Sequence, residues 1–575
     1  MYAATIRGRQ DSSVDHADAT VNLYVSERYT YKTDEFYTFD NITFIDKSSV
    51  ITTPDALLEL MNDSTKLAGH YVLGADIDLS QYTGELTQKP IGNYDSIFTG
   101  CFDGAGHEIT GLDITAEGCV GLFGCIELAQ IRNLTVRGAV KNTFAATSAE
   151  TKYTADGSHH GVTGLIAGTV FAHSEVINCK AYGTTEGKGN VGGMLGMVKN
   201  YGNWTINIEY CDNYAVPTNT LGNTGGLISR ITSNGIAKIG VEIIGCNNYA
   251  DITNTAGDRA RLAGIVGYIR NEINQVVITD CVNYGDLSGS NSSSSTSNRP
   301  HVGGICGRAE VTYPTGGTKA QASSVIVSKC RNEGDISSTY MSGGIFGYCQ
   351  RSSAVTGAVS FTECENKGNV SAATYGAGII GYVQNEHATI LYTIDKCANY
   401  GSVTSDSASG AGGLIGRVKG CTITNCFSSG EIIGTTRTNL GALFGISTTA
   451  NSTAANCYAV AGVDTKLVGV DATTLVLTDS AFVENAGVKD SYAGFDFTDA
   501  WTIRDGMPVL DCFTTEPTGD VDADGTVTNS DITLAVRHLS GFDIEYRADR
   551  FDLTGDGKLN NRDAIALIVK MNFAQ

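Results

Sequence analysis

Regularly spaced aspartates near the C-terminus carry the clearest chemistry in this sequence. A twelve-residue calcium loop takes oxygen ligands from positions 1, 3, 5, 7, 9 and 12 and has glycine at position 6. Gly525 fills position 6 of segment 520–531, and the predicted ligands are Asp520, Asp522, Asp524, Thr526 through its carbonyl, Thr528 and Asp531. Because calcium is a hard cation that prefers oxygen donors, this EF-hand-like spacing predicts a calcium site.

A second loop with the same spacing begins at residue 552. Its predicted ligands are Asp552, Thr554, Asp556, Lys558 through its carbonyl, Asn560 and Asp563. Threonine at position 3 removes a carboxylate ligand, so we expect this site to bind calcium more weakly than the first. The C-terminal segment is therefore predicted to hold two Ca²⁺ ions.

Each loop leads directly into an amphipathic helical pattern, and neither follows an entering helix. With aspartate at position 12 and a tandem duplication, residues 519–573 resemble a type I dockerin. The resemblance implies a small all-α calcium-binding module over 513–575 that binds a cohesin module of a scaffold or cell-surface protein. It also implies that loop positions 10 and 11 select the cohesin, and these are Asn529, Ser530, Asn561 and Arg562.

A long repeat occupies most of the chain before this module. Cysteine recurs at 179, 211, 246, 281, 330, 364, 397, 426 and 457, and asparagine follows two residues later at 213, 248, 283, 332, 366 and 399. A Gly-Gly-apolar-apolar-Gly motif comes next, as at 192–196, 303–307, 343–347 and 412–416. One such unit cannot bury its apolar face alone, whereas stacked copies can. The repeat therefore predicts a mainly β fold, a parallel β-helix over residues 66–512.

Stacking would place equivalent side chains in columns with a spacing of about 4.8 Å. Since a disulfide requires roughly 3.8 Å between Cβ atoms, we expect a column of reduced thiols rather than a chain of disulfides. Asparagine tolerates left-handed turns, and its amide can pair with the amide of the next coil.

Segments such as GGLIGRV, GGIFGYC and GGICGRA resemble the GLUG motif of bacterial surface proteins. The stretches 71–112 and 493–510 resemble the opening and closing segments of such regions. The resemblance implies a right-handed β-helix and no particular activity. Residues 1–65 lack the repeat, and Thr53 and Pro54 begin a short helical pattern over 53–62, so we expect 1–65 to cap the N-terminal end.

The composition narrows the classes of partner. The net charge of −22 disfavours nucleic acid and anionic lipid, and no apolar run is long enough to span a membrane. The N-terminal segment MYAATIRGRQ lacks the apolar core of a signal peptide, although the dockerin resemblance implies an extracellular, cell-surface location. We expect a monomer outside the complex.

Candidate sites on the predicted solenoid are sparse. Tyrosines share one repeat position at Tyr182, Tyr214, Tyr249, Tyr284 and Tyr400, where they either stack on sugar rings or form a ladder between coils. Arg299, His301 and Arg308 could line a groove, and His159-His160 is a weak metal candidate. Paired carboxylates of the kind a glycosidase needs do not stand out, so catalytic residues stay unassigned.

These features predict an extracellular component of a cohesin–dockerin polysaccharide-degrading complex, whose β-helix binds polysaccharide or a surface partner. The resemblance is to cellulosome- or amylosome-type components of anaerobic gut or rumen bacteria. Two alternatives stay open: the β-helix is a polysaccharide lyase or glycoside hydrolase, or it is an architectural spacer or adhesin.

Overall fold

Two compact units make up the chain. The computed structural model describes residues 21–24, 42–45, 48–145, 161–200, 205–233, 240–255, 260–271, 275–291, 299–312, 323–405, 409–434, 439–447, 451–460, 466–470, 475–504, 506–513, 529–539, 564 and 567. One unit spans residues 49–511, and the other combines residues 1–48 with 512–575. Residues 49–65, which belong to the predicted N-terminal cap over 1–65, lie in the larger unit.

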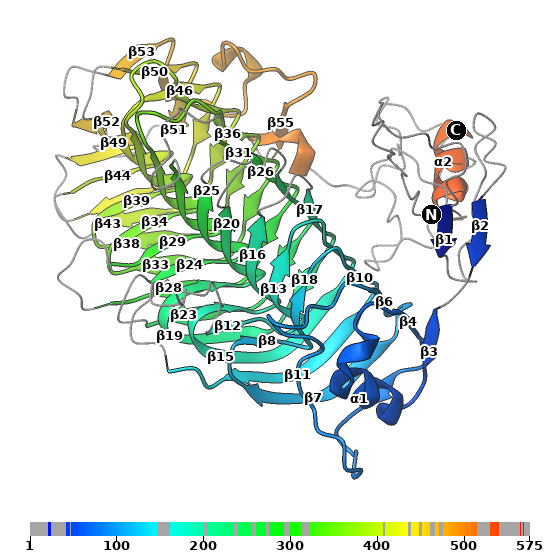
Figure 1. Ribbon diagram of the computed structural model, residues 1–575. Coiled ribbons are helices and arrows are strands. Elements are labelled where there is room, and N and C mark those ends of the chain that lie inside the picture. Colours follow the sequence, from blue (N-terminus) through cyan, green and yellow to red (C-terminus); the bar gives the residue numbers. More distant parts are fainter. Residues whose placement is uncertain are drawn as a thin grey trace, which may run out of the picture. The chain divides into compact units, whose positions relative to one another are not determined.

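The larger unit is a parallel β-solenoid (Figure 1), as the repeat predicts. Its first sheet is a ladder of 14 described strands, in which each coil adds one strand beside the preceding one. These are β3 (Ser49–Ile51), β4 (His70–Leu73), β6 (Cys101–Asp103), β10 (Gln130–Arg132), β14 (Glu175–Ile177), β17 (Ile206–Glu209), β21 (Val241–Ile244), β26 (Gln275–Thr279), β31 (Ser324–Ser328), β36 (Val359–Thr362), β41 (Tyr392–Asp395), β46 (Cys421–Thr424), β50 (Ser452–Ala455) and β53 (Leu475–Thr478).

The second sheet contains the coil segments after each cysteine and after each glycine motif. In the early coils these are β5 (Ile77–Asp78), β7 (Glu108–Ala116), β8 (Cys119–Val120), β9 (Phe123–Ile126), β11 (Thr135–Asn142), β12 (Val162–Thr163), β13 (Ala167–Phe171), β15 (Lys180–Gly192), β16 (Leu195–Asn200) and β19 (Val216–Gly225). The strands after successive cysteines are β18 (Asp212–Asn213), β22 (Asn247–Asn248), β27 (Val282–Asn283), β32 (Arg331–Asn332), β37 (Glu365–Asn366), β42 (Ala398–Asn399), β47 (Phe427–Ser428) and β51 (Tyr458–Val460), and β54 (Ala481–Val483) follows Ser480 in the last coil.

Two further ladders of this sheet flank the glycine motif. The strands before it are β24 (Arg261–Ala263), β29 (His301–Gly303), β34 (Met341–Gly343), β39 (Tyr375–Ala377) and β44 (Ala411–Gly412). The strands after it are β20 (Ile228–Ser233), β25 (Val266–Asn271), β30 (Cys306–Val311), β35 (Phe346–Arg351), β40 (Ile380–Asn385) and β45 (Ile415–Val418), and both ladders end on β49 (Leu440–Ser447), followed by β52 (Lys466–Val470).

A smaller sheet of six described strands forms an arm beside the main core. It contains β23 (Ile252–Asn254), β28 (Leu287–Gly289), β33 (Ile336–Ser338), β38 (Val370–Ala372), β43 (Val403–Ser405) and β48 (Ile432–Gly434). Its apolar residues pack with Leu262 and Val302 into a second core that is separate from the main one. Each coil therefore contributes residues to two separate apolar cores.

A buried ladder of asparagine side chains joins successive coils. In each link, Nδ2 of one asparagine donates to Oδ1 of the next at 2.8–2.9 Å, along the series Asn213, Asn248, Asn283, Asn332, Asn366 and Asn399. The second glycine of each motif lies against this ladder, and a Cβ on Gly264 would fall 2.0 Å from Oδ1 of Asn283. The repeated asparagine and the glycine motif thus depend on each other, because the asparagine amides occupy the space that any side chain at this glycine would fill.

The cysteines form a buried column, and none of the chain's 16 cysteines is disulfide-bonded. The left-handed turn of each corner lies one residue before the cysteine, as at Asp280 (φ 52°) and Lys329 (φ 50°). The asparagines that follow do not form this turn, because Asn248 and its equivalents lie in strands. Their amides pair between coils as expected.

Elements at both ends of the solenoid differ from the repeat. The helix α1 (Pro54–Asn62) begins at Thr53, whose side chain accepts a hydrogen bond from Ala56 N at 3.3 Å, and its residues Leu57 and Leu58 are buried in the main core. This unit also contains two short helices, η1 (Ser64–Lys66) and η3 (Lys489–Ser491), and the antiparallel pair β55 (Trp501–Arg504) and β56 (Met507–Leu510). The short helix η4 (Asp511–Phe513) spans its C-terminal boundary.

Candidate functional site: a basic cluster and a calcium-binding tail

In-register side chains on the strands after the glycine motif form a column of arginines and tyrosines. The pairing of successive coils aligns, in order, Arg230, Tyr268, Arg308, Tyr348, Tyr382 and Arg417. The apolar neighbours of these residues, such as Ile231 and Ile269, point the other way into the main core. The column therefore lies on the outer side of these strands.

A second column on the strands before the motif converges on the first. It consists of Arg261, His301, Met341 and Tyr375, again in register, while the alternate residues Leu262 and Val302 enter the second core. The guanidinium of Arg261 lies 3.8 Å from the ring centre of Tyr268, and His301 stacks on Tyr348 at 5.2 Å. Consecutive strands thus form two walls of one inward corner, and we call these two columns, together with Arg270, Arg299, Glu310 and Tyr340, the basic cluster.

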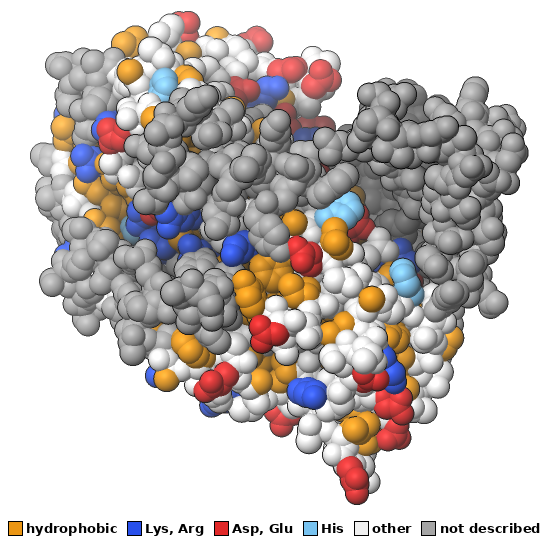
Figure 2. Space-filling view, in the orientation of Figure 1, with side chains coloured by type: hydrophobic (Ala, Val, Ile, Leu, Met, Phe, Trp, Pro, Cys, Tyr) orange, Lys and Arg blue, Asp and Glu red, His pale blue; other side chains and the backbone are white. Residues whose placement is uncertain are grey.

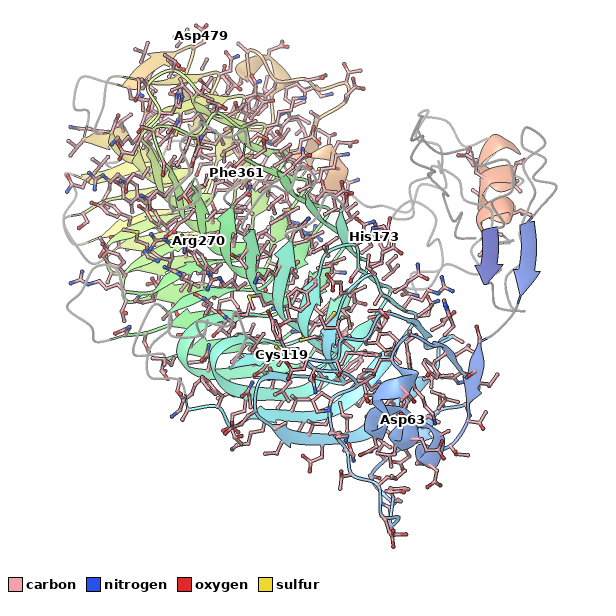
Figure 3. The ribbon with its side chains drawn as sticks, viewed as in Figure 1. Asp63, Cys119, His173, Arg270, Phe361 and Asp479 are labelled. Carbon is pink, nitrogen blue, oxygen red and sulfur yellow. The ribbon has the colours of Figure 1, made fainter. Side chains whose placement is uncertain are left out.

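The basic cluster is positively charged on a chain whose net charge is −22. Figure 2 shows Lys and Arg side chains gathered over the region where Figure 1 labels β24, β29 and β25, and Figure 3 places Arg270 in the same region. Among the described residues, Glu310 is the carboxylate that pairs with these arginines, through contacts to Arg308 and, at 3.9 Å, to Arg261. Tyr268 also donates to Glu310 at 2.6 Å.

Burial shifts the pKa values of the acidic and the basic groups of the cluster in opposite directions. Burial raises the pKa of Glu310, but Arg308 and Arg261 more than offset this effect, so its pKa is lowered overall. Burial also lowers the pKa of Arg261 to about 10. Because this value is still well above neutral pH, the guanidinium stays charged there. The pKa of His301 is held well below its usual range by burial and by the two arginines, so its imidazole is neutral.

Hydrogen bonds and cation–π contacts also join the residues at the other end of the cluster. Arg417 donates to the hydroxyl of Tyr375 at 3.1 Å, and its guanidinium lies 4.7 Å from the ring centre of Tyr382. Tyr348 donates to Gln384 at 2.5 Å. Cation–π contacts of this kind hold both partners in fixed orientations.

The predicted tyrosine column is a face-to-face stack on a different surface. Ring centres are 4.4 Å apart for Tyr182 and Tyr214, 4.5 Å for Tyr214 and Tyr249 and 4.8 Å for Tyr249 and Tyr284, with interplanar angles of 3–5°. Tyr400 does not join this stack, since its hydroxyl donates to the carbonyl of Pro508 at 3.0 Å. The inner rings cover one another's faces, which leaves mainly ring edges for a ligand.

The described part of the tail includes the end of the first predicted calcium loop. The helix α2 (Asn529–Leu539) begins at loop position 10, and Asp531, the predicted ligand at position 12, is buried in its first turn. Ala535 packs with Ala564 and Leu567 of the second half, whereas Val536 is 47% exposed. An all-oxygen donor set that ends on a buried aspartate fits calcium.

The other predicted residues of the tail cannot be placed. Side chains of Asn529 and Ser530 are not described, and the remaining ligands of both loops, with Asn561 and Arg562, lie outside the described residues, as do His159 and His160. Within the described ranges, no group of three or more His, Cys, Asp and Glu side chains could hold a metal ion. No helix in the same ranges is long and apolar enough to cross a membrane.

Comparison with known proteins identifies the tail. Residues 518–572 match the dockerin type I domain, so the chain ends in a type I dockerin, as the loop spacing predicts. Type I dockerins typically bind Ca²⁺, and they dock onto cohesin modules of cellulosome-like complexes. The molecule is thus a parallel β-solenoid that carries a dockerin.

Two further proteins resemble other parts of the chain. Halomucin of Haloquadratum walsbyi is 33% identical over 156 residues, which cover 25% of this chain and 2% of halomucin. The crystal structure of a proposed immunoglobulin A1 protease from Bacteroides ovatus aligns over 81% of this chain and 93% of its own, with 14% identity and a TM-score of 0.27. At these values neither likeness bears on function.

Proposed function

We propose that this protein is an extracellular component of a cohesin–dockerin assembly that degrades polysaccharide, and that its solenoid binds polysaccharide at the basic cluster. The dockerin holds the protein in the assembly through calcium, and the solenoid presents the ligand-binding surface. The observation that carries the proposal is the in-register column of Arg and Tyr side chains from Arg230 to Arg417. Such a column offers repeated hydrogen-bond donors and rings along one line, which suits a polymer.

The charge state of Glu310 favours binding over hydrolysis. A glycosidase needs two carboxyl groups, one of which must stay protonated to act as the general acid. Glu310 instead has a lowered pKa and is engaged by Arg308, Arg261 and Tyr268. A carboxylate held in this way orients its partners and is a poor proton donor at neutral pH.

Affinity electrophoresis of the full-length chain in gels containing different polysaccharides tests the binding proposal. We expect at least one polysaccharide to retard the wild type, Tyr268→Ala to lose the retardation, and Tyr249→Ala in the tyrosine stack to keep it. Retardation by no polysaccharide would contradict the proposal. Release of reducing ends or unsaturated products by the wild type, lost in Glu310→Gln, would show that the solenoid is catalytic.

A panel of immobilised cohesin modules tests the docking half of the proposal. The wild type should bind at least one cohesin in calcium and be released by EGTA. The double variant Asp520→Ala/Asp552→Ala should lose cohesin binding and keep its retardation by polysaccharide, because the two functions belong to separate units. Binding by the double variant equal to that of the wild type would contradict calcium-dependent docking.

A further inference from the structure

The basic cluster contains more buried donors than the described acceptors satisfy. Arg261 is 5% exposed and His301 is 2% exposed. The Nε atoms of Arg261, Arg308 and Arg417 and Nδ1 of His301 are buried without a hydrogen-bond partner. A buried cation without a sufficient counter-charge is costly, so this arrangement favours an anionic ligand that supplies the missing negative charge.

The geometry of the columns specifies a linear ligand. Arg230 and Arg417 are separated by five coil intervals, which span roughly 24 Å at about 4.8 Å per coil. Each interval is close to the length of one pyranose ring in an extended chain. A polymer that runs along the solenoid axis would therefore present one sugar to each coil.

Neutral hydrogen-bonding groups lie between the cations of the cluster. Tyr348 and Gln384 are linked by a hydrogen bond, and Gln350 accepts one from Arg308 at 3.3 Å. Hydroxyl and amide groups of this kind match sugar hydroxyls, while an arginine fork matches the two oxygens of a carboxylate or sulfate. A ligand that mixes hydroxyls with anionic groups satisfies both sets.

From these observations we propose that the basic cluster recognises an acidic polysaccharide, one that bears uronate carboxylates or sulfate esters and lies along the solenoid axis. This inference rests on the proposed function and adds the class of ligand. The carboxylate and the sulfate share the same chemistry, an anionic oxygen pair on a sugar ring. Peptides and nucleic acids with the same charge lack the pattern of ring hydroxyls.

Isothermal titration of the full-length chain with a six-residue oligogalacturonate tests the inference, and the methyl ester of the same oligosaccharide is the neutral control. Arg308→Gln and Arg308→Lys test the guanidinium. Arg137→Gln is the matched control variant, because Arg137 also covers a tyrosine ring, that of Tyr182 at 3.9 Å, and pairs with Glu108 at 2.7 Å, but lies outside the cluster. A sulfated oligosaccharide of equal length separates the two anionic groups.

We expect the wild type to bind the oligogalacturonate or its sulfated counterpart at least about tenfold more tightly than the ester, equivalent to ~1.4 kcal/mol. Arg308→Gln should lose about tenfold or more, Arg308→Lys should regain only part of that loss, and Arg137→Gln should match the wild type. Equal binding of the ester and the acid, or equal binding of polyglutamate, would overturn the acidic-glycan inference while leaving polysaccharide binding intact. If neither acidic nor neutral oligosaccharides bind, the proposed function fails as well.

Discussion

Asn248 offers the sharpest test of what holds the coils together. Its Nδ2 donates to Asn283 Oδ1 at 2.8 Å and to the carbonyl of Ala250 at 2.9 Å, and its Oδ1 accepts from Asn213 at 2.9 Å. The side chain is fully buried, and Gly226 packs against it. Asn248→Ala removes three hydrogen bonds, two of which join neighbouring coils.

The expected loss of stability follows from these contacts. Each buried hydrogen bond contributes about 1 kcal/mol net, and an acceptor left without its donor, here Asn283 Oδ1, costs a further 1–3 kcal/mol or so. We expect Asn248→Ala to lower the free energy of unfolding by roughly 4–6 kcal/mol. The adjacent Asn247 is the matched control, because its single side-chain bond, to Asp212 at 3.0 Å, lies at the partly exposed outer surface.

Urea unfolding followed by circular dichroism measures both variants. Asn248→Ala should shift the midpoint to lower urea without a change in slope, whereas Asn247→Ala should lose less than about 1 kcal/mol. Because neighbouring coils interact in one dimension, the destabilised coils are expected to open first, so hydrogen exchange should rise in β18, β22 and β27. Equal destabilisation by the two substitutions would refute the role assigned to the amide ladder.

Three other outcomes follow from the structure. Tyr249→Ala should lower the free energy of unfolding about twice as much as Tyr284→Ala. Tyr249 stacks on two rings at ~0.5–1.5 kcal/mol each, whereas Tyr284 stacks on one of the described tyrosines. Equal losses in urea unfolding would contradict this prediction. The pKa of His301 is lowered in the folded state, so the contribution of His301 to stability is present above pH ~6.5 and is lost as the pH falls below that value. Unfolding midpoints measured across pH 5–8 or so should therefore depend less on pH in His301→Gln than in the wild type. Removal of calcium with EGTA should abolish cohesin binding and leave the β-sheet circular dichroism of the solenoid unchanged, and collapse of the β signal would refute the separation of the two units.

Much of the fold could be predicted because its determinants repeat in the sequence. Equivalent positions such as Cys281 and Asn283 hold one residue type through many coils, and a column of identical side chains is visible as a periodic pattern. The dockerin was equally accessible, because the predicted ligands of each calcium loop lie within twelve residues of one another. The left-handed turn was harder to place, since the residue before each cysteine changes from coil to coil, as at Asp280 and Lys329.

The basic cluster was largely missed for a related reason. Consecutive members of each column lie 34–40 residues apart and vary in type, and only the coil register brings Arg308 beside Tyr348. His301 and Arg308 were candidates, but the sequence interpretation did not link them to Arg261 or Tyr268. A signal did exist: the residue that follows the last position of the glycine motif is Arg or Tyr in six successive coils. Repeated motifs therefore reveal the basic cluster when their variable positions are compared.

The most direct test of the whole account is a bridging assay on immobilised cohesin. Beads carrying a cohesin that binds the wild type are incubated with the full-length chain, calcium and a labelled oligogalacturonate. We predict that the label stays on the beads with the wild type, that EGTA releases it together with the protein, and that Arg308→Gln binds the beads without retaining the label. Retention of the label to the same extent by Arg308→Gln, or its absence with a docked wild type, would contradict the assignment of acidic-glycan binding to the basic cluster.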